Sequence, residues 1–158
     1  MRALAAMIFA MTTAIATVVG FATNVPHMFE IRVTTVDPTP DTEEIVFTNQ
    51  ATKATEIMHV VKTPVLDETM VHSATVQTQE HDPYSYVEVV FTDMGRDRFA
   101  LLTRQNIERR IVIFVDGALV VAPIIKAEIT GGKFWLSGRM STSEASELTH
   151  KINQAIKK

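Results

Sequence analysis

The alternation of apolar and polar residues predicts several short strands in the first half of the chain. Residues 29–33 alternate with a period of two, which is typical of a half-buried strand. Two prolines within residues 37–41 end it, because proline cannot donate to a ladder. Residues 45–47, 57–61 and 74–79 are further strand candidates, and Asp67 is a candidate N-cap for a short helical turn between them.

The pattern is stronger after residue 83. Residues 84–92 are rich in aromatic and β-branched side chains, which predicts a central strand. Asp93 follows as a candidate N-cap, and residues 93–107 carry apolar side chains at helical spacing. Residues 111–115 are apolar on both faces, as in a buried strand. Asp116 and Gly117 then predict a tight hairpin, since both positions tolerate positive φ.

The remaining residues predict an extended return and a closing helix. Residues 118–129 read as a strand in which Pro123 marks an edge or a bulge, and Gly131 and Gly132 close a second hairpin into residues 133–137. Ser141 and Glu144 form a capping box that opens an amphipathic helix reaching residue 156. We therefore expect an α+β fold: a largely antiparallel β-sheet of about six strands packed with two amphipathic α-helices.

Residues 1–22 differ from the rest of the chain. After Arg2 they are uncharged and mostly apolar, and they end in small residues, which predicts a secretory signal cleaved after Ala22. An uncleaved N-terminal anchor helix, associated with the membrane through residues 3–22, is the alternative. Either interpretation places one domain, residues 27–158, outside the cytoplasm, in the periplasm or cell envelope. Its halves are residues 27–82 and 83–158.

Composition narrows the classes of function. The chain is 46% hydrophobic and 21% charged, which is typical of a globular protein, and it has no cysteine. Disulfides, thiol catalysis and cysteine-bound metal are therefore excluded. The first half is acidic and the second mildly basic, but the basic residues are interspersed with acids, which argues against nucleic-acid binding.

The candidate chemical motifs are weak. Gly131, Gly132 and Lys133 suggest a phosphate loop, but no Ser or Thr and no helix follows, so a turn is favoured. The histidines at 27, 59, 72, 81 and 150 form no close pair, and His81 with Asp82 comes nearest to a ligand pair. We expect no metal and no cofactor.

Nucleophilic and acid–base motifs are equally weak. Ser137 followed by Gly138 lacks the remaining residues of a nucleophile elbow. The acidic pairs at 43–44 and 67–68 lie in turn-like segments, where solvated carboxylates are more common than a catalytic dyad. The arginines between 96 and 110 could bind an acidic partner or lipid headgroups, although the solvated face of a helix is favoured. We expect no catalytic residue.

A set of residues between 87 and 156 carries a family resemblance in order, spacing and type. It comprises Phe91, Thr92, Gly95, Phe99, Ala100, Leu102, Thr103, Asn106, Arg109, Arg110, Ile113, Asp116, Gly117, Ala122, Pro123, Ile125, Ile129, Gly131, Gly132, Ser137, Gly138, Glu144 and Ala145. This stretch resembles the head of the large periplasmic domain of SecD, the membrane-embedded export factor that assists the Sec translocon. The first half fits the family only loosely. The family usually has a small residue where Glu108 stands and commonly serine where Val121 stands.

The resemblance implies a non-enzymatic module that binds unfolded or exported polypeptide, or docks on a Sec-type membrane protein. SecD also has membrane helices and a second periplasmic subdomain, which this sequence does not include, so we do not expect this head to drive export by itself. Two alternatives remain. One is an envelope ligand-binding module that kept the fold without a transport role, and the other is a small periplasmic hydrolase that uses His81, Asp82 or the acidic loops.

Three residues are candidates for contact with a partner: Trp135, Arg109 and Arg110. If Phe134 and Leu136 face the core, strand alternation points Trp135 outwards, and we favour a tryptophan that is covered there by a helix over one that is open to a partner. The residues that characterise the turns of the resembled fold are Asp116, Gly117, Ala122, Pro123, Gly131, Gly132 and Gly138.

Overall fold

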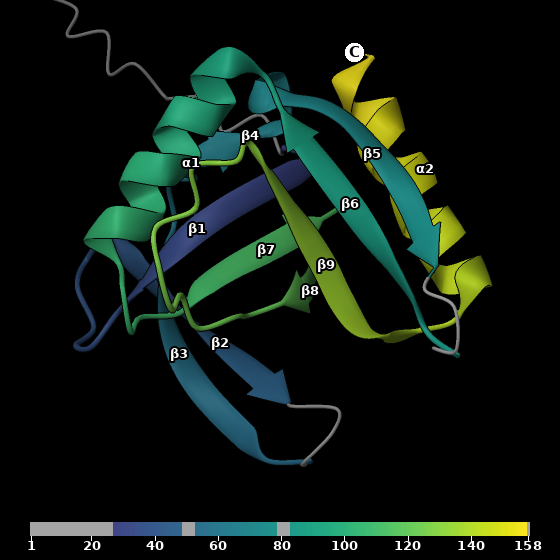
Figure 1. The fold of residues 1–158 in the computed structure, drawn as a ribbon. Helices are drawn as coiled ribbons and strands as arrows, with labels where there is room; N and C mark the ends of the chain where they lie inside the picture. The colour runs from purple at the N-terminus through teal and green to yellow at the C-terminus, as the bar shows by residue number, and fades with distance from the viewer. Residues whose placement is uncertain (1–26, 49–52, 79–82, 158) are drawn as a thin grey trace, which may run out of the picture.

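Two antiparallel sheets and two α-helices form the part of the chain that the computed structural model describes, residues 27–48, 53–78 and 83–157 (Figure 1). The strands are β1 (Phe29–Thr35), β2 (Thr42–Thr48), β3 (Thr55–Val61), β4 (Leu66–Asp67), β5 (Val71–Thr78), β6 (Ser85–Phe91), β7 (Ile111–Val115), β8 (Ala118–Val121) and β9 (Lys133–Met140). The helices are α1 (Asp93–Gln105), α2 (Thr142–Ile156) and the 3-10 turn η1 (Glu68–Met70). The predicted signal or anchor segment 1–22 lies outside the described residues, as do His81 and Asp82.

The larger sheet has the strand order β2-β3-β1-β7-β8, and β4 also pairs with β1. The first five residues of β1 pair with β7, in a register that sets Phe29 opposite Val115 and Val33 opposite Ile111. All five residues of β7 are buried, which confirms the prediction of a strand covered on both faces. Its alternate side chains Val112 and Phe114 pack with Met58 and Val60 of β3 in a second, smaller cluster.

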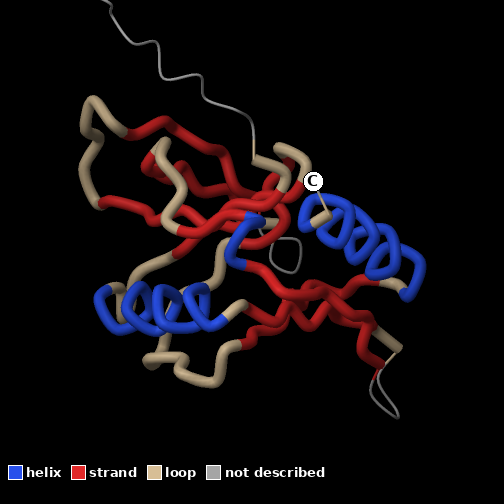
Figure 2. The backbone as a smooth tube through the Cα atoms, turned by 90° about the horizontal axis from the view of Figure 1, so that it is seen from above, coloured by secondary structure: helices blue, strands red, loops and turns tan. Residues whose placement is uncertain are grey.

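The smaller sheet has the order β5-β6-β9, and it lies as a separate layer against the larger one (Figure 2). The main core fills the space between the layers and is closed by residues from both helices, including Phe99 and Leu102 of α1 and Ala145 and Ile152 of α2. α1 and α2 lie on opposite sides of the molecule in both views. The expected α+β class is confirmed, and the division of its strands into two sheets is what the structure adds.

Both helices begin at a side-chain cap. The capping box of α2 is confirmed, because the Ser141 hydroxyl accepts from the N–H of Glu144 and the Glu144 carboxylate accepts from the N–H of Ser141. At α1 the predicted cap was wrong by one residue. Thr92, not Asp93, caps the helix, because its hydroxyl accepts from the N–H of Gly95. Asp93 instead lies in the first turn, where the negative charge of a carboxylate interacts favourably with the helix dipole.

The two glycine turns have different outcomes. Asp116 and Gly117 have φ of 54° and 72°, and they close the β7–β8 hairpin as predicted. The second predicted hairpin was wrong: Gly131 and Gly132 do not join β9 to a neighbouring strand, because β9 pairs with β6. Gly132 has φ of 70°, and a Cβ there would lie 3.2 Å from Cγ of Arg96. It is therefore a site of left-handed backbone and close packing.

The predicted strand 118–129 was also wrong in length. β8 ends at Val121. The chain then runs without regular strand structure through Ala122 and the exposed Pro123, and an isolated bridge pairs Arg110 with Ile124. Pro123 has no N–H to donate, but its carbonyl accepts from the N–H of Ile111 at 3.1 Å, so the proline interrupts the pairing without ending it. Gly138, the last of the predicted turn residues, lies inside β9, with open space where a Cβ would stand.

The connection from α1 to β7 contains a strained residue. Glu108 has φ of 63°, the left-handed region that side chains other than glycine disfavour. Its N–H donates to the carbonyl of Ile125 at 2.8 Å, which holds the backbone in this turn.

Among the helices of the described residues, none combines the length and the apolar character that crossing a bilayer requires.

Candidate functional site

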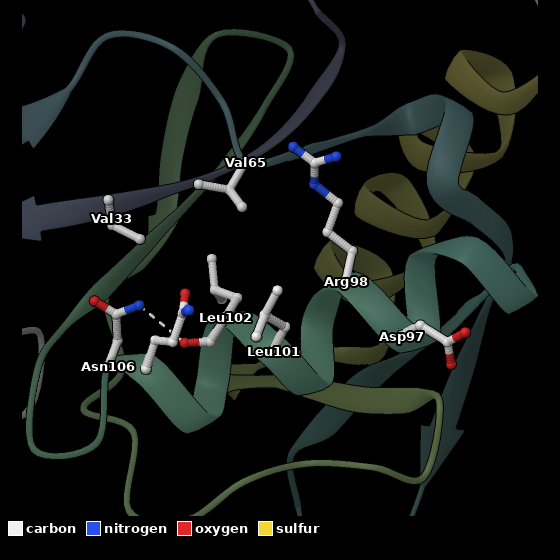
Figure 3. Close-up of a pocket in the computed structure, with 8 residues that line it drawn as sticks. Val33, Val65, Asp97, Arg98, Leu101, Leu102 and Asn106 are labelled. Atoms are coloured by element: carbon white, nitrogen blue, oxygen red, sulfur yellow. Dashed lines mark hydrogen bonds between the residues drawn. The ribbon is translucent and has the colours of Figure 1, made fainter.

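An apolar groove runs between α1 and the β1 strand. It is a cavity of about 540 Å³ lined by Val33, Val65, Asp97, Arg98, Leu101, Leu102, Gln105 and Asn106 (Figure 3). Val33 follows Phe29 and Ile31 on the core-facing side of β1, so the groove is the open end of the main core. Leu102 is buried at its base, whereas Val33 and Val65 are only half-buried.

Two polar side chains at the rim of the groove have no polar partner among the described residues. Neither the guanidinium of Arg98 nor the amide of Gln105 has a hydrogen bond or ion pair within the described ranges. Figure 3 shows Arg98 reaching towards Val65, while Asp97 points away from the groove. Asp97 instead accepts from Arg96 at 3.1 Å. The rim thus offers donors to a bound molecule, and the base offers apolar contact.

The flank of α1 beside this groove carries exposed apolar side chains. Met94 is 63% exposed and Leu101 is 42% exposed. They stand seven positions apart, with Arg98 between them, and such positions share one side of a helix. Together, Met94, Leu101 and the groove give an apolar strip with a cationic centre. This arrangement suits an apolar side chain of a peptide better than it suits an acid–base reaction.

A second surface surrounds Trp135 on the outer face of the smaller sheet. Trp135 is 54% exposed, which confirms that it points outwards, but the expectation of a covering helix was wrong, since no helix of the described residues covers it. Its ring centroid lies 5.0 Å from that of Tyr86, and its indole N–H donates to Glu88 at 3.0 Å. Lys133 pairs with the same carboxylate oxygen at 3.1 Å, so Lys133 serves the sheet surface and not a phosphate loop.

We expect the fluorescence of Trp135 to report the titration of Glu88. The hydrogen bond from Trp135, and then that from Lys133, lower the pKa of Glu88 below its usual value of 4.5. These contacts therefore stabilise the folded chain above the usual pKa, and their contribution is lost as the pH falls through the lowered one. Trp135 is the only tryptophan, so its emission should change in one step below pH 4.5 while the circular dichroism stays constant. The step should disappear in Glu88→Gln, and its persistence there would assign it to another group.

The two arginines expected to contact a partner differ in their surroundings. Arg109 is exposed, and its side chain has no polar partner in the described part of the chain. Arg110 is engaged inside the molecule: its guanidinium donates to the carbonyl of Ala122 at 2.7 Å and to Glu56 at 3.1 Å, and it stacks over Phe47. Arg110 thus fastens the β2–β3 hairpin to the connection after β8.

Other titratable side chains are mostly spread over the surface. His59 has Nδ1 3.9 Å from a Glu44 oxygen, His150 contacts Gln154 on α2, and His72 is exposed on β5. Glu43 pairs with Arg32 at 2.6 Å, at the wall of a second cavity of about 490 Å³. That cavity also holds Glu30, which pairs with the same arginine, so these charges compensate each other.

Within the described part of the chain, one group of side chains could hold a metal ion. His27, Asp67 and Glu68 place one ligand atom each within 4.8 Å of one another, a convergence that the sequence did not predict. Asp67 is also the N-cap of η1, as predicted, and Glu68 accepts from the N–H of Phe29 at 3.4 Å. The three side chains therefore already attach the start of β1 to η1.

The sequence missed most residues of the two surfaces. Leu101 was detectable as an apolar residue away from the helical stripe of residues 99, 102 and 106. Val33 and Val65 were not, because only the fold brings them beside α1. Tyr86 and Glu88 lie on the predicted central strand, but their contact with Trp135 depends on the pairing of β6 with β9.

Comparison with protein families gives a match over most of the chain. Residues 43–155 match the family described as SecDF, P1 head subdomain. The protein translocase subunit SecDF of Thermus thermophilus is 44% identical over 62 residues, which are 39% of this chain and 8% of that protein. The protein translocase subunit SecD of Magnetococcus marinus is 30% identical over 100 residues, which are 63% of this chain and 19% of that protein. The chain thus spans less than a fifth of either relative.

Solved structures give the same result. The structure titled "Structure and function of a membrane component SecDF that enhances protein export" superposes with a TM-score of 0.61 at 25% identity. The match covers 80% of this chain and 61% of that one. A SecDF crystal structure in a super-membrane-facing form gives the same TM-score and covers 18% of that chain.

Proposed function

Since the chain belongs to the SecDF P1 head subdomain family, we propose that it is a non-enzymatic, extracytoplasmic module that binds polypeptide during Sec-dependent export. Its curated relatives are named as protein translocase subunits, and a similar solved structure is titled as a component that enhances protein export. The domain that does so here comprises residues 27–158, and residues 1–22 serve as its signal or anchor.

The apolar groove beside α1 carries this proposal. An exported chain passes unfolded and exposes apolar side chains, which the base formed by Val33, Val65 and Leu102 can accept. Gln105 and Arg98 at the rim can donate to the carbonyls of the same segment. The groove is open at the surface, so it suits brief binding of many different segments.

Docking on a Sec-type membrane partner is the second part of the proposal. Arg109 is exposed in the turn after α1 and has no polar partner within the described residues, so it can meet an acidic surface. Arg110 supports this docking surface without binding the partner itself, because its guanidinium already donates to the carbonyl of Ala122 and to Glu56. Trp135 lies on a different surface, the outer face of the smaller sheet.

Site-specific photocrosslinking tests the groove. A photoreactive residue at Leu101 should form adducts with an identified secretory protein arrested during export, and the same residue at Val46 should not. Val46 is the matched control, because it is 64% exposed but lies on β2, away from the groove. Equal labelling from both positions, or none from Leu101, would contradict the proposal.

A charge in the groove should weaken binding without unfolding the chain. Leu101→Asp removes an apolar contact and places a carboxylate on the flank of the groove, so the affinity for an unfolded polypeptide should fall about tenfold, or about 1.4 kcal/mol. Val46→Asp should leave the affinity unchanged. Binding of a small apolar molecule by the groove, with no affinity for polypeptide, would instead favour the envelope ligand-binding alternative.

A further inference from the structure

One edge of the smaller sheet is closed by a side chain. The N–H of Ala74 on β5 donates to Oδ1 of Asn153 at 3.0 Å, and the carbonyl of Ala74 accepts from Nδ2 of the same amide at 2.8 Å. Asn153 stands on α2, so the last helix occupies the groups that another strand would need at this edge. A further strand therefore cannot add beside Ala74.

The opposite edge, β9, has backbone groups facing away from the sheet. The N–H of Phe91 on β6 donates to the carbonyl of Gly132 at 2.9 Å. Because bonded and non-bonded pairs alternate in an antiparallel ladder, the backbone groups of Phe134 face β6, and those of Lys133 and Trp135 face outwards. Within residues 27–48, 53–78 and 83–157 no hydrogen bond engages these outward groups.

A fixed aromatic side chain stands beside this open edge. Trp135 projects from the outer face, where the Tyr86 ring and the Glu88 carboxylate hold the indole in place. Cross-strand neighbours on one face contact each other, so a side chain of an added strand would pack on the indole. These contacts hold the indole in one conformation before a partner binds, which lowers the entropy cost of binding.

We propose that β9 accepts an extended polypeptide as a fourth strand of the smaller sheet, through the backbone groups of Lys133 and Trp135 and with an apolar side chain on the indole. This inference rests on the proposed function, since the strand would come from an exported chain. The outward N–H and C=O groups of β9 recur at every second residue, and this spacing matches the backbone groups of an extended polypeptide of any sequence. β2 is also an edge strand, but it carries the adjacent carboxylates Glu43 and Glu44, charges that commonly protect such edges, whereas the ammonium of Lys133 on β9 is paired with Glu88 at 3.1 Å.

Amide hydrogen exchange of the full chain, read by NMR, tests this proposal. The probe is a reduced and carboxymethylated polypeptide that stays unfolded. At saturating probe the amides of Lys133 and Trp135 should exchange at least tenfold more slowly. The Ala74 amide is the internal control, because Asn153 already binds it, and its exchange should not change. Trp135→Thr, which keeps a strand-forming residue, should weaken probe binding about tenfold without changing the circular dichroism.

The other outcomes separate the two proposals. Changes confined to the methyl signals of Val65 and Leu101 would overturn the β9 proposal and leave the groove proposal standing. Changes at neither surface would overturn both. Slowed exchange at β2 but not at β9 would also overturn the inference. If the amides of Lys133 and Trp135 exchanged more slowly at higher protein concentration without the probe, the edge would be assigned to a second copy of this chain, which would overturn the inference.

Discussion

Replacing Gly95 with alanine should destabilise the fold by about 3 kcal/mol or more, at the top of the usual range for overpacking. A Cβ at this position would lie 2.2 Å from the carbonyl oxygen of Met70. That oxygen is backbone and already accepts from the N–H of Thr92 at 2.9 Å, so it cannot move without losing the start of α1. Alanine favours a helix over glycine by about 1 kcal/mol, which is too little to offset the collision.

Gly131→Ala is the matched control for this substitution. Nothing lies within 4 Å of a Cβ built at Gly131, and its φ is not in the left-handed region, so we expect a change within about 0.5 kcal/mol. Urea denaturation followed by circular dichroism measures both variants. If Gly95→Ala unfolded at the same urea concentration as the natural sequence, the close approach of α1 to η1 would not be a constraint.

The second large effect should come from Phe99→Ala, which we expect to cost about 3–5 kcal/mol. Phe99 is 1% exposed, and its ring centroid lies 4.8 Å from that of Phe91 and 5.3 Å from that of Phe134. These three rings join α1 to two strands of the smaller sheet. Truncating the middle one removes apolar burial and leaves a cavity where three elements meet.

Met94→Ala provides the control on the same helix. Its side chain is 63% exposed, so its loss should change the free energy of unfolding by less than about 1 kcal/mol. Thermal denaturation of the two variants gives the comparison. A similar loss of stability in both would mean that the aromatic cluster is no more important than the exposed flank of α1.

Local features of the fold were predictable wherever the responsible residues are neighbours in sequence. Asp116 and Gly117 both adopt positive φ, and Ser141 with Glu144 forms the expected capping box. Each depends on contacts within four residues, so the sequence contains the whole cause. The error at α1 is of the same local kind, since Thr92 and Asp93 are both good caps and only the backbone decides between them.

Features that depend on distant pairing were not predictable. Gly131 and Gly132 have the composition of a hairpin turn, yet β9 pairs with β6, which lies more than 40 residues earlier in the chain. A turn motif carries no information about a partner so far away. The groove has the same origin, because β1 brings Val33, and the segment before β4 brings Val65, to the flank of α1.

The candidate contact residues show where sequence reasoning about function ends. Alternation pointed Trp135 away from the core, because the period of a strand is a local property, but the helix expected to cover it is not there, since that depends on the whole fold. The surroundings of Arg110 were hidden, since Glu56 and Phe47 reach it from the β2–β3 hairpin. Charge and exposure of a side chain can be inferred from a pattern, whereas its partner cannot.

The pairing of β1 with β7 also has a consequence for the order in which the chain folds. Phe29 finds its strand partner only at Val115, and the edge at Ala74 is closed only by Asn153 near the C-terminal end. Such distant contacts must overcome the entropy of closing long loops, which makes folding slow compared with a helical bundle. When the chain is delivered N-terminus first, these distant contacts therefore cannot all form until its last helix is present. For that period this domain is itself an unfolded polypeptide of the kind that it is proposed to bind.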